Sequence, residues 1–354
     1  MNDTHKFPYQ WTLKDAQFTK DKGAVFSCFA CGGGSTMGYK LAGFDVIGCN
    51  EIDPRMAECY KANHNPKYCF VEPIQTFKDR TDLPAELYDL DILDGSPPCS
   101  SFSSAGIREK GWGQEKMFAE GQSKQVLDTL FFDFVDLVGK LKPKIVIAEN
   151  VKGLILGAAQ KYVNDVLIAF DKAGYYVDFK LLNASLMGVP QRRERVFLYA
   201  IRKDLYRGPF VDLFQTQPEL QLMFNEAPIL FSDFYAPGID DRPANCNGKM
   251  FGYWQNRKRG DESFADTIMR MENKERCFAK KYLYLDHVPM TYTSNSDIYL
   301  FDEYRKPNRH ESCCIGSFPH DYNFMGKPYN YLVGMSVPPV MMAQIATNIY
   351  KQWL

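Results

Sequence analysis

With 354 residues, 45 % of them hydrophobic, the chain is long enough to bury a large core, which excludes a single small module and favours one large domain with an insertion, or two domains. The formal net charge of −1 gives no argument for nucleic-acid binding from total charge. The first residues lack a basic region followed by an apolar run, and the apolar runs are short of a bilayer span, so we expect no membrane association and a cytoplasmic protein.

The ten cysteines are scattered through the expected strands, helices and loops, which indicates reduced thiols and not a disulfide framework. Cys28 and Cys31 form a lone CxxC pair. No second pair and no paired histidines accompany it at zinc spacing, and it lies where a strand enters a glycine loop. We therefore expect no metal site.

Residues 24–50 predict a strand, a glycine loop, a short helix and a second strand, followed directly by Glu51. Gly32, Gly33 and Gly34 let the backbone approach a ligand at a helix N-terminus, although a tight strand-to-helix turn also requires glycine. An acidic residue at the end of the second strand is where a doubly wound sheet binds a ribose. The pattern favours a nucleoside cofactor and leaves open a dinucleotide or S-adenosylmethionine.

Residues 91–103, DILDGSPPCSSFS, begin as a short buried strand that ends at Asp94, then break into a glycine and two prolines before Cys99. A cysteine held on such a loop is a candidate nucleophile, although any Gly-Pro-Pro loop needs a small residue next. The segment at 103–122 is long and polar, and a loop of this length beside a candidate nucleophile more often has a function than none.

Further helices and strands alternate up to about residue 201. We expect a helix that begins at Asp53 and Pro54, and a third strand at 68–71 followed by Glu72. A second helix is expected to begin at Ser123 and to carry an apolar stripe through Leu141. The remaining expected elements are a strand at 144–148, a helix at 159–172 and antiparallel strands at 175–183 and 195–201. Glu149 follows the strand at 144–148, where a carboxylate either caps the next helix or serves a ligand. Gln191 and three nearby arginines form either a solvated turn or a site for phosphate or a carbonyl oxygen.

From about residue 202 to about 310 the alternation of strand and helix is lost. Residues 242–281 contain ten Lys or Arg against five Asp or Glu, and Asn256, Arg257 and Arg259 lie near aromatic residues there. Basic residues interleaved with aromatics and amides suit nucleic-acid contact, but such a run is more often a solvated face. A final apolar helix is expected after residues 334–339.

Taken together and in this order, these stretches resemble the DNA cytosine-5 methyltransferase family over most of the chain outside about 202–290. The matching residues are Phe29 to Gly34, Glu51, the Pro-Pro-Cys at 97–99 with Ser103, Glu149 to Val151, Gln191, Arg193, Arg195, Arg309, Glu311, Phe318, Pro319, Gly334, Ser336 and Val337. The chain departs from the family pattern where Cys31 stands for a glycine, Ser100 for a glutamine, Cys314 for an arginine and Met335 for an asparagine. Glu72 stands for an aspartate and keeps the carboxylate.

The resemblance implies an α/β fold, with a Rossmann-like, S-adenosylmethionine-dependent methyltransferase sheet and a smaller irregular target-recognition domain. It implies a catalytic domain at 22–201 plus 312–354 and a target-recognition domain at 202–311. The implied cofactor-binding residues are Phe29, Ala30, Gly32, Gly33, Gly34, Glu51, Ile52, Glu72, Pro98, Ser336 and Val337. The implied substrate-binding residues are Ser103, Asn150, Gln191, Asn256, Arg257 and Arg259.

The implied reaction is methylation of cytosine at carbon 5, which is too weak a nucleophile to attack a methyl sulfonium unaided, so a thiolate must first add to carbon 6. The resemblance gives this role to Cys99. Glu149 would serve ring nitrogen 3 and Arg195 the ring oxygen, while Arg193 would support the loop or a phosphate. A stacked base exposes neither face, so the target must leave the duplex.

The expected partner is double-stranded DNA, with a cognate restriction endonuclease acting separately on the same site, and the expected form is a nucleoid-associated monomer. Three alternatives stay open. A transfer-RNA cytosine methyltransferase would share the catalytic residues. An NAD-dependent oxidoreductase would explain the glycine loop and Glu51 but not Cys99, Glu149 and Arg195 at successive strand ends, and a catalytically silent DNA-binding module would leave all three without a role.

Overall fold

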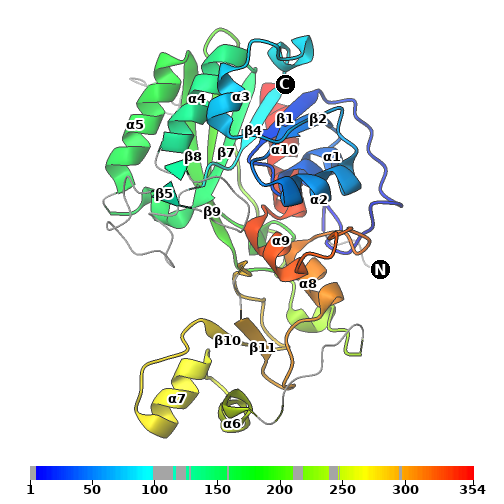
Figure 1. Ribbon diagram of the computed structural model, residues 1–354, viewed down its shortest axis with the longest axis vertical. Coiled ribbons are helices and arrows are strands. Elements are labelled where there is room, and N and C mark those ends of the chain that lie inside the picture. Colours follow the sequence, from blue (N-terminus) through cyan, green and yellow to red (C-terminus); the bar gives the residue numbers. More distant parts are fainter. Residues whose placement is uncertain are drawn as a thin grey trace.

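A seven-stranded sheet forms the centre of the computed structural model, which describes residues 5–98, 129–157, 159–209, 218–238, 246, 248–294 and 297–354, together with the short strands at 115–116 and 125–126. The strand order is β3-β2-β1-β4-β7-β9-β8 (Figure 1). The strands are β1 (Ala24–Cys28), β2 (Asp45–Asn50), β3 (Tyr68–Phe70), β4 (Ile92–Gly95), β7 (Ile145–Val151), β8 (Tyr175–Asn183) and β9 (Glu194–Arg202). Strands β5 (Glu115–Lys116) and β6 (Gln125–Val126) form a separate antiparallel pair.

Five neighbouring strands of the sheet, from β3 to β7, run parallel, whereas β9 pairs antiparallel with both β7 and β8. The chain builds outward from β1 through β2 to β3 and then returns to place β4 on the other side of β1. The chain continues from β1 toward one edge of the sheet and from β4 toward the other, so the two connections separate at the carboxyl ends of β1 and β4. Open α/β sheets bind ligands at such a position. The fold therefore directs attention to the residues that follow β1, β2, β4 and β7.

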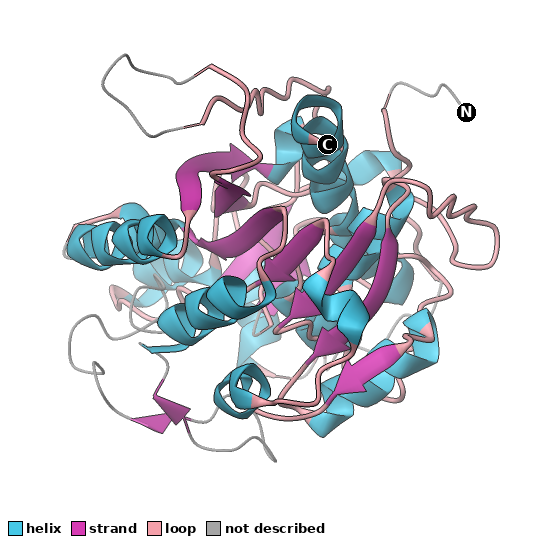
Figure 2. Cartoon of the chain, turned by 90° about the horizontal axis from the view of Figure 1, so that it is seen from above, coloured by secondary structure: helices cyan, strands magenta, loops and turns pink. Residues whose placement is uncertain are grey.

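Alternate residues along each central strand pack on opposite faces of the sheet, as the period of two in a strand requires. Phe26, Leu93 and Val146 pack on one face with α3, α4 and α5. Their strand neighbours pack on the other face with α1 and α10. The result is a three-layer α/β fold with helices on both sides of the sheet, visible from above in Figure 2, and it confirms the predicted fold class.

The helices and short helical turns have the following bounds. They are α1 (Gly34–Leu41), α2 (Pro54–His64), α3 (Ile74–Asp79), α4 (Leu130–Leu141), α5 (Ala159–Lys172), α6 (Lys249–Gln255), α7 (Phe264–Glu272), α8 (Arg309–Gly316), α9 (Tyr329–Met335), α10 (Pro339–Trp353), η1 (Ala85–Tyr88), η4 (Lys152–Ile155), η5 (Ala184–Leu186) and η6 (Phe231–Asp233). Helix α2 opens as predicted, because the Asp53 carboxylate accepts a hydrogen bond from the Arg55 amide at 2.9 Å and Pro54 occupies the first turn.

The helix predicted from Ser123 begins later than expected. Helix α4 starts at Leu130, and Val126 belongs to strand β6, while Ser123 itself lies outside the described residues. A periodic apolar pattern identifies the buried face of a helix but not its first residue, because apolar residues just before the helix fit the same spacing by chance. The buried stripe from Leu130 to Leu141 is confirmed.

An apolar segment near the C-terminus, Tyr329–Trp353, passes the length and composition test for a membrane span, with a mean hydropathy of 1.3. The sequence analysis expected no run of this length. In the structure the segment comprises α9 and α10, and 89 % of its most apolar window is buried inside the protein. This burial is that of a core helix, because α10 packs directly on α1 against the sheet.

The stretch predicted to be irregular contains short elements that form a lobe below the sheet in Figure 1. Helices α6 and α7 pack there with the parallel strands β10 (Lys280–Leu283) and β11 (Asp297–Leu300). The lobe has an aromatic core of its own, made by Tyr253, Phe264, Ile268, Tyr282, Tyr284 and Phe301. It is therefore a folded unit and not a solvated loop.

Candidate active site

The turn that follows β1 is held by the carboxylate of Glu51, which lies at the end of the neighbouring strand β2. Glu51 is 6 % exposed, and its two oxygens accept the backbone N–H groups of Cys31 at 2.7 Å and Asp53 at 2.8 Å. Burial raises the pKa of Glu51. Cys31, which stands where the resemblance expects glycine, adopts a left-handed φ of 47°, and the bond from its amide offsets part of the roughly 1–2 kcal/mol that this conformation costs.

The same turn is clamped from its outer side by two residues that the sequence analysis did not single out. The Tyr322 hydroxyl donates to the carbonyl oxygen of Gly32 at 2.6 Å, and His64 Nε2 lies 3.2 Å from the same oxygen. A Cβ on Gly33, which has a φ of 83°, would lie 2.2 Å from His64 Nε2, and one on Gly34 would lie 2.3 Å from a backbone oxygen. Only glycine fits these two positions, and no local pattern marks Tyr322 or His64.

The predicted cofactor residues gather at the carboxyl ends of four parallel strands. Phe29 follows β1, Glu51 follows β2, Glu72 lies beyond β3, and Pro98 lies beyond β4. Ser336 packs against the glycine turn, with its Cβ 2.7 Å from the position of a Cβ added at Gly34. The acceptors fit a nucleoside, because the buried Glu51 and the part-buried Glu72, which also pairs with Arg80, can accept hydrogen bonds from ribose hydroxyls and ring amines. Ala30 lies in the same turn and Ile52 follows β2, whereas Val337 lies between α9 and α10, with its carbonyl oxygen 2.3 Å from the position of a Cβ added at Gly34.

A second link joins the loop after β4 to the end of β7. The Asn150 side chain is 3 % exposed and donates from Nδ2 to the carbonyl oxygen of Pro97 at 3.0 Å. Asn150 is thus placed to position the Pro-Pro stretch, and its predicted contact with substrate stays a prediction. The predicted nucleophile Cys99 and the predicted substrate residue Ser103 lie outside the described residues.

Glu149 and Arg195 meet at the centre of the site. Arg195 Nε lies 2.9 Å from Glu149 Oε1, and the two side chains are 14 % and 13 % exposed. Arg195 pairs with Val151 across the antiparallel β7–β9 ladder, so that both charged groups occupy the same end of adjacent strands. The geometry brings the two predicted residues into contact, and the roles predicted for them stay predictions.

Gln191 and Arg193 are buried and contact main-chain groups of other segments, while their predicted contacts with substrate or phosphate stay predictions. Gln191 Nε2 donates to the carbonyl oxygen of Ile315 at 3.0 Å, and its Oε1 accepts the Tyr292 amide at 2.9 Å. Arg193 Nη1 donates to two main-chain carbonyl oxygens, at 2.9 and 3.1 Å, and burial lowers the pKa of Arg193 to about 9. These contacts join the segment that leads into β9 to α8, α9 and the residues around Tyr292. Gln191 and Arg193 therefore position these segments relative to one another.

Asp94 is a further acid at this edge that the sequence analysis left without a function. It is 1 % exposed, lies at the end of β4, and accepts hydrogen bonds from Ser27 Oγ at 2.7 Å and the Tyr39 hydroxyl at 3.2 Å. Burial raises the pKa of Asp94 to about 7, and the nearby charge of Glu149 contributes in the same direction. Its only sequence signal was an acid inside a fully buried strand.

The three candidates for reading DNA have different surroundings within the lobe. Arg257 is occupied internally, since its guanidinium stacks 3.5 Å from the Trp254 ring centroid and donates to the carbonyl oxygens of Trp254 and Phe301. Asn256 donates to the carbonyl oxygen of Gly252 at 2.8 Å. Arg259 pairs with Asp286 on the surface, where its side chain is 64 % exposed. Arg259 is therefore the candidate best placed for DNA.

The comparison with known families decides the membership. The sequence model described as "C-5 cytosine-specific DNA methylase" matches residues 23–351. The chain belongs to this family. Among its relatives, M.FnuDI of Fusobacterium nucleatum, a Type II methyltransferase, is 33 % identical over 223 residues, covering 63 % of this chain and 60 % of that protein.

Two other Type II methyltransferases show how sequence similarity to known proteins is distributed along this chain. M.Sau96I of Staphylococcus aureus is 38 % identical over 52 % of this chain and 40 % of its own length. M.AplI of Arthrospira platensis is 26 % identical over 92 % of this chain and 85 % of its own length. The match to this chain spans only about half the length of several curated relatives.

Solved structures of other proteins have the same fold as this chain. A candidate DNA modification methyltransferase encoded within an Escherichia coli prophage superposes with a TM-score of 0.64 at 19 % identity, covering 93 % of this chain and 98 % of that one. DNMT2 of Spodoptera frugiperda gives a TM-score of 0.61 at 16 % identity, covering 92 % and 99 %. At these identities the likeness concerns the fold alone.

Asp94 predicts a pH dependence of stability. Because its folded pKa of about 7 lies above the ordinary value of 3.8, the folded protein holds a proton on Asp94 that the unfolded chain releases, so the contribution of Asp94 to stability falls as pH rises from about 4 to about 7. Asp94→Asn does not ionise and keeps one oxygen acceptor, so that one of the Ser27 and Tyr39 hydroxyls still donates and the other can accept from the amide nitrogen. Relative to wild type, we expect the variant to gain stability over this range, by at most about 4 kcal/mol.

Urea unfolding midpoints at pH 5, 6, 7 and 8 measure this difference, with Asp89→Asn, an exposed acid on the approach to β4, as the control. A constant difference between Asp94→Asn and wild type at all four pH values would contradict the burial argument.

Proposed function

We propose that the protein transfers a methyl group from S-adenosylmethionine to carbon 5 of a cytosine within a specific duplex DNA sequence, through a covalent bond to Cys99. The observation that carries the proposal is the Glu149–Arg195 pair, an acid and a cation 2.9 Å apart in a largely buried position at the carboxyl edge of the sheet. The Asn150 bond to Pro97 supports it, because that bond anchors the loop two residues before Cys99 beside this pair.

In this mechanism the Cys99 thiolate forms a bond to carbon 6 of the cytosine, and the ring electrons move toward carbon 5. Glu149 donates a hydrogen bond and a proton to ring nitrogen 3, where negative charge develops. Arg195 stabilises the charge near the ring oxygen. After carbon 5 has gained the methyl group, a base removes the carbon 5 proton and the bond between carbon 6 and sulfur breaks. Ring nitrogen 3 returns its proton to Glu149, and Cys99 is regenerated as the thiolate.

S-adenosylmethionine, when bound, supplies a methyl group activated on a sulfonium. Glu51 and Glu72 would accept hydrogen bonds from its ribose and adenine, and the turn at 29–34, with Ser336 and Val337 beside it, would hold the nucleoside. The Tyr322 and His64 contacts support this role, because they fix the turn before any ligand arrives.

We assign the catalytic domain to residues 22–201 plus 312–354, and the target-recognition domain, which would bind DNA, to residues 202–311. The aromatic core of the lobe supports a recognition unit around residues 253–301, since such a unit must keep its shape while its surface residues vary. Tyr206, Leu220 and Leu222, in contrast, pack in the core beside the sheet. Arg259 would contact the duplex, and the segment at 100–122 would cover the extruded base. A cognate restriction endonuclease that recognises the same sequence, a monomeric state and a cytoplasmic location at the nucleoid complete the proposal.

Loss of the nucleophile should abolish the reaction. Cys99→Ser is expected to reduce methyl transfer to background while binding of S-adenosylmethionine persists, because serine is a far weaker nucleophile. Wild-type protein should also form a covalent complex with duplex DNA that contains 5-fluorocytosine, which lacks the proton needed for release. Transfer of labelled methyl groups and denaturing gels report both results, with Cys277→Ser as the cysteine control; robust turnover by Cys99→Ser would contradict the mechanism.

Loss of the acid should slow the chemical step without preventing cofactor binding. Glu149→Gln is expected to lower kcat about 100- to 1,000-fold, because the proton at ring nitrogen 3 is no longer supplied. Glu194→Gln, which changes the half-exposed glutamate paired with Lys152, is the matched control and should keep kcat within about twofold. Equal rates for the two variants would remove Glu149 from the mechanism.

The lobe can be tested through its exposed arginine. Arg259→Ala is expected to weaken binding to duplex DNA and to lower the slope of log affinity against log salt by about one. Arg202→Ala, at the far end of β9 from the active edge, is the control for a lost surface charge. Unchanged affinity and slope in Arg259→Ala would place DNA recognition elsewhere, and methylation of transfer RNA instead of duplex DNA would favour the RNA alternative.

A further inference from the structure

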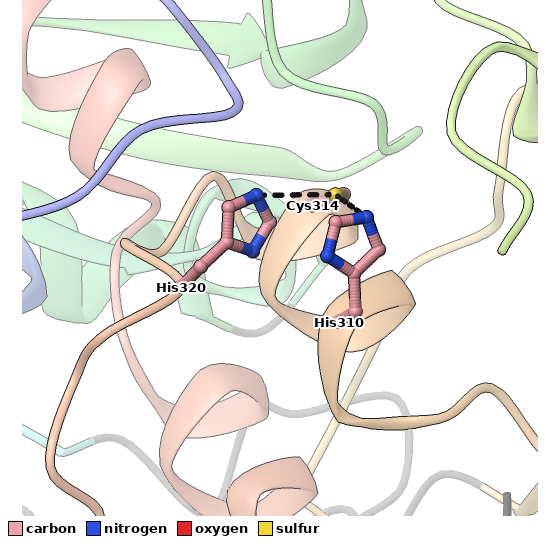
Figure 3. A group of neighbouring side chains, drawn as sticks. All are labelled: His310, Cys314 and His320. Carbon is pink, nitrogen blue, oxygen red and sulfur yellow. Dashed lines mark hydrogen bonds between the residues drawn. The ribbon is translucent and has the colours of Figure 1, made fainter. Parts of the chain in front are cut away.

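One cluster of metal-ligand side chains lies outside the proposed active site. His310, Cys314 and His320 each offer one ligand atom, and these three atoms all lie within 4.8 Å of one another. Figure 3 shows both imidazole rings with a nitrogen directed at the sulfur of Cys314. The sequence analysis expected no metal site, because it sought a second cysteine pair or paired histidines at zinc spacing.

Local structure explains how the three residues meet. His310 and Cys314 are four residues apart on α8, which puts them on the same face of the helix. The helix ends at Ser317, whose φ of 51° turns the chain back over the helix, and a backbone bond from Phe318 to Cys313 fixes that reversal. His320 therefore returns to the face that carries the other two residues.

The spacing of the ligand atoms is close to that of a metal site. Cys314 Sγ lies 3.8 Å from His310 Nε2 and 3.9 Å from His320 Nε2. A tetrahedral zinc ion with ordinary bond lengths separates sulfur from nitrogen by about 3.6 Å, so both sulfur–nitrogen distances are close to those around a bound ion. The two imidazole rings stack with centroids 4.3 Å apart and an interplanar angle of 12°, so at least one ring would rotate out of this stack for both nitrogens to face one ion.

The two nitrogens of the His320 ring have different surroundings. Nε2 lies 3.9 Å from Cys314 Sγ, whereas Nδ1 is a buried nitrogen without a hydrogen-bond partner among the described residues. An ion bound to Nε2 would place the ring proton on Nδ1.

We propose that His310, Cys314 and His320 bind a divalent transition metal, with zinc as the best match. One thiolate and two imidazoles form a nitrogen and sulfur ligand set, which selects zinc over magnesium or calcium. Binding requires that the Cys314 thiol release its proton to solvent, so that sulfur coordinates as the thiolate. Three protein ligands leave a fourth position, which water fills.

The metal would act on the proposed cofactor site through the chain that follows His320. The segment after α8 carries Tyr322, whose hydroxyl holds the carbonyl oxygen of Gly32. The His320 amide donates to the Trp11 carbonyl oxygen, so the N-terminal segment is joined to the same place. Metal binding would thus stabilise the outer clamp of the glycine turn without contacting the reacting atoms.

Metal binding can be tested without any assay of methyl transfer. Reduced protein is stripped with a chelator and titrated with cobalt(II), which reports tetrahedral coordination and thiolate ligation by visible and near-ultraviolet absorption. We expect one cobalt ion per chain, with a sulfur-to-cobalt charge-transfer band that zinc displaces, and a higher unfolding temperature with zinc than without. The charge-transfer band should disappear in Cys314→Ser.

Matched variants separate this site from the other cysteines and histidines. Cys277→Ser and His287→Ala, which lie in the lobe, should keep the full cobalt signal. His310→Ala should weaken cobalt binding by about tenfold or more even if Cys314→Ser fails to fold. A wild-type protein without a charge-transfer band, or a band and affinity unchanged in His310→Ala and Cys314→Ser, would overturn the proposal.

Discussion

The antiparallel pairing of β9 with β7 is the constraint on which the rest of the site depends. In a parallel sheet the residues at the carboxyl ends of the strands face a ligand, while those at the amino ends lie on the far side. Because β9 runs in the opposite direction, its first residues lie beside the last residues of β7. This reversal brings the Arg195 guanidinium to the Glu149 carboxylate, which Arg195 could not reach from the start of a parallel strand.

Around that pair, hydrogen bonds join segments that lie far apart in the chain. Asn150 holds the loop after β4, Gln191 and Arg193 hold α8 and α9, and Tyr322 holds the turn after β1. Each bond has at least one main-chain partner, so the geometry depends on backbone paths more than on neighbouring side chains. Such an arrangement fixes the edge before substrate binds, which lowers the cost of ordering it during reaction.

Sequence patterns predicted the sheet well and the roles of individual polar residues less well. Alternating buried strands and the cap at Asp53 are local signals, and these elements lie where they were expected. Burial of Gln191 and Arg193 depends on packing against distant segments, which no local pattern encodes. The same limit applies to the cluster at His310, Cys314 and His320, where the helical spacing of two members was visible but the return of His320 required the turn at Ser317.

The central claim is that this edge of the sheet performs covalent methylation of cytosine at carbon 5 in duplex DNA. The most direct measurement is mass spectrometry of nucleosides from duplex DNA incubated with the purified protein and isotopically labelled S-adenosylmethionine, followed by bisulfite mapping of the same DNA. The account predicts that the label occurs in 5-methyldeoxycytidine and that the modified cytosines share one sequence. Label on the exocyclic nitrogen of cytosine, or no label in DNA, would contradict it.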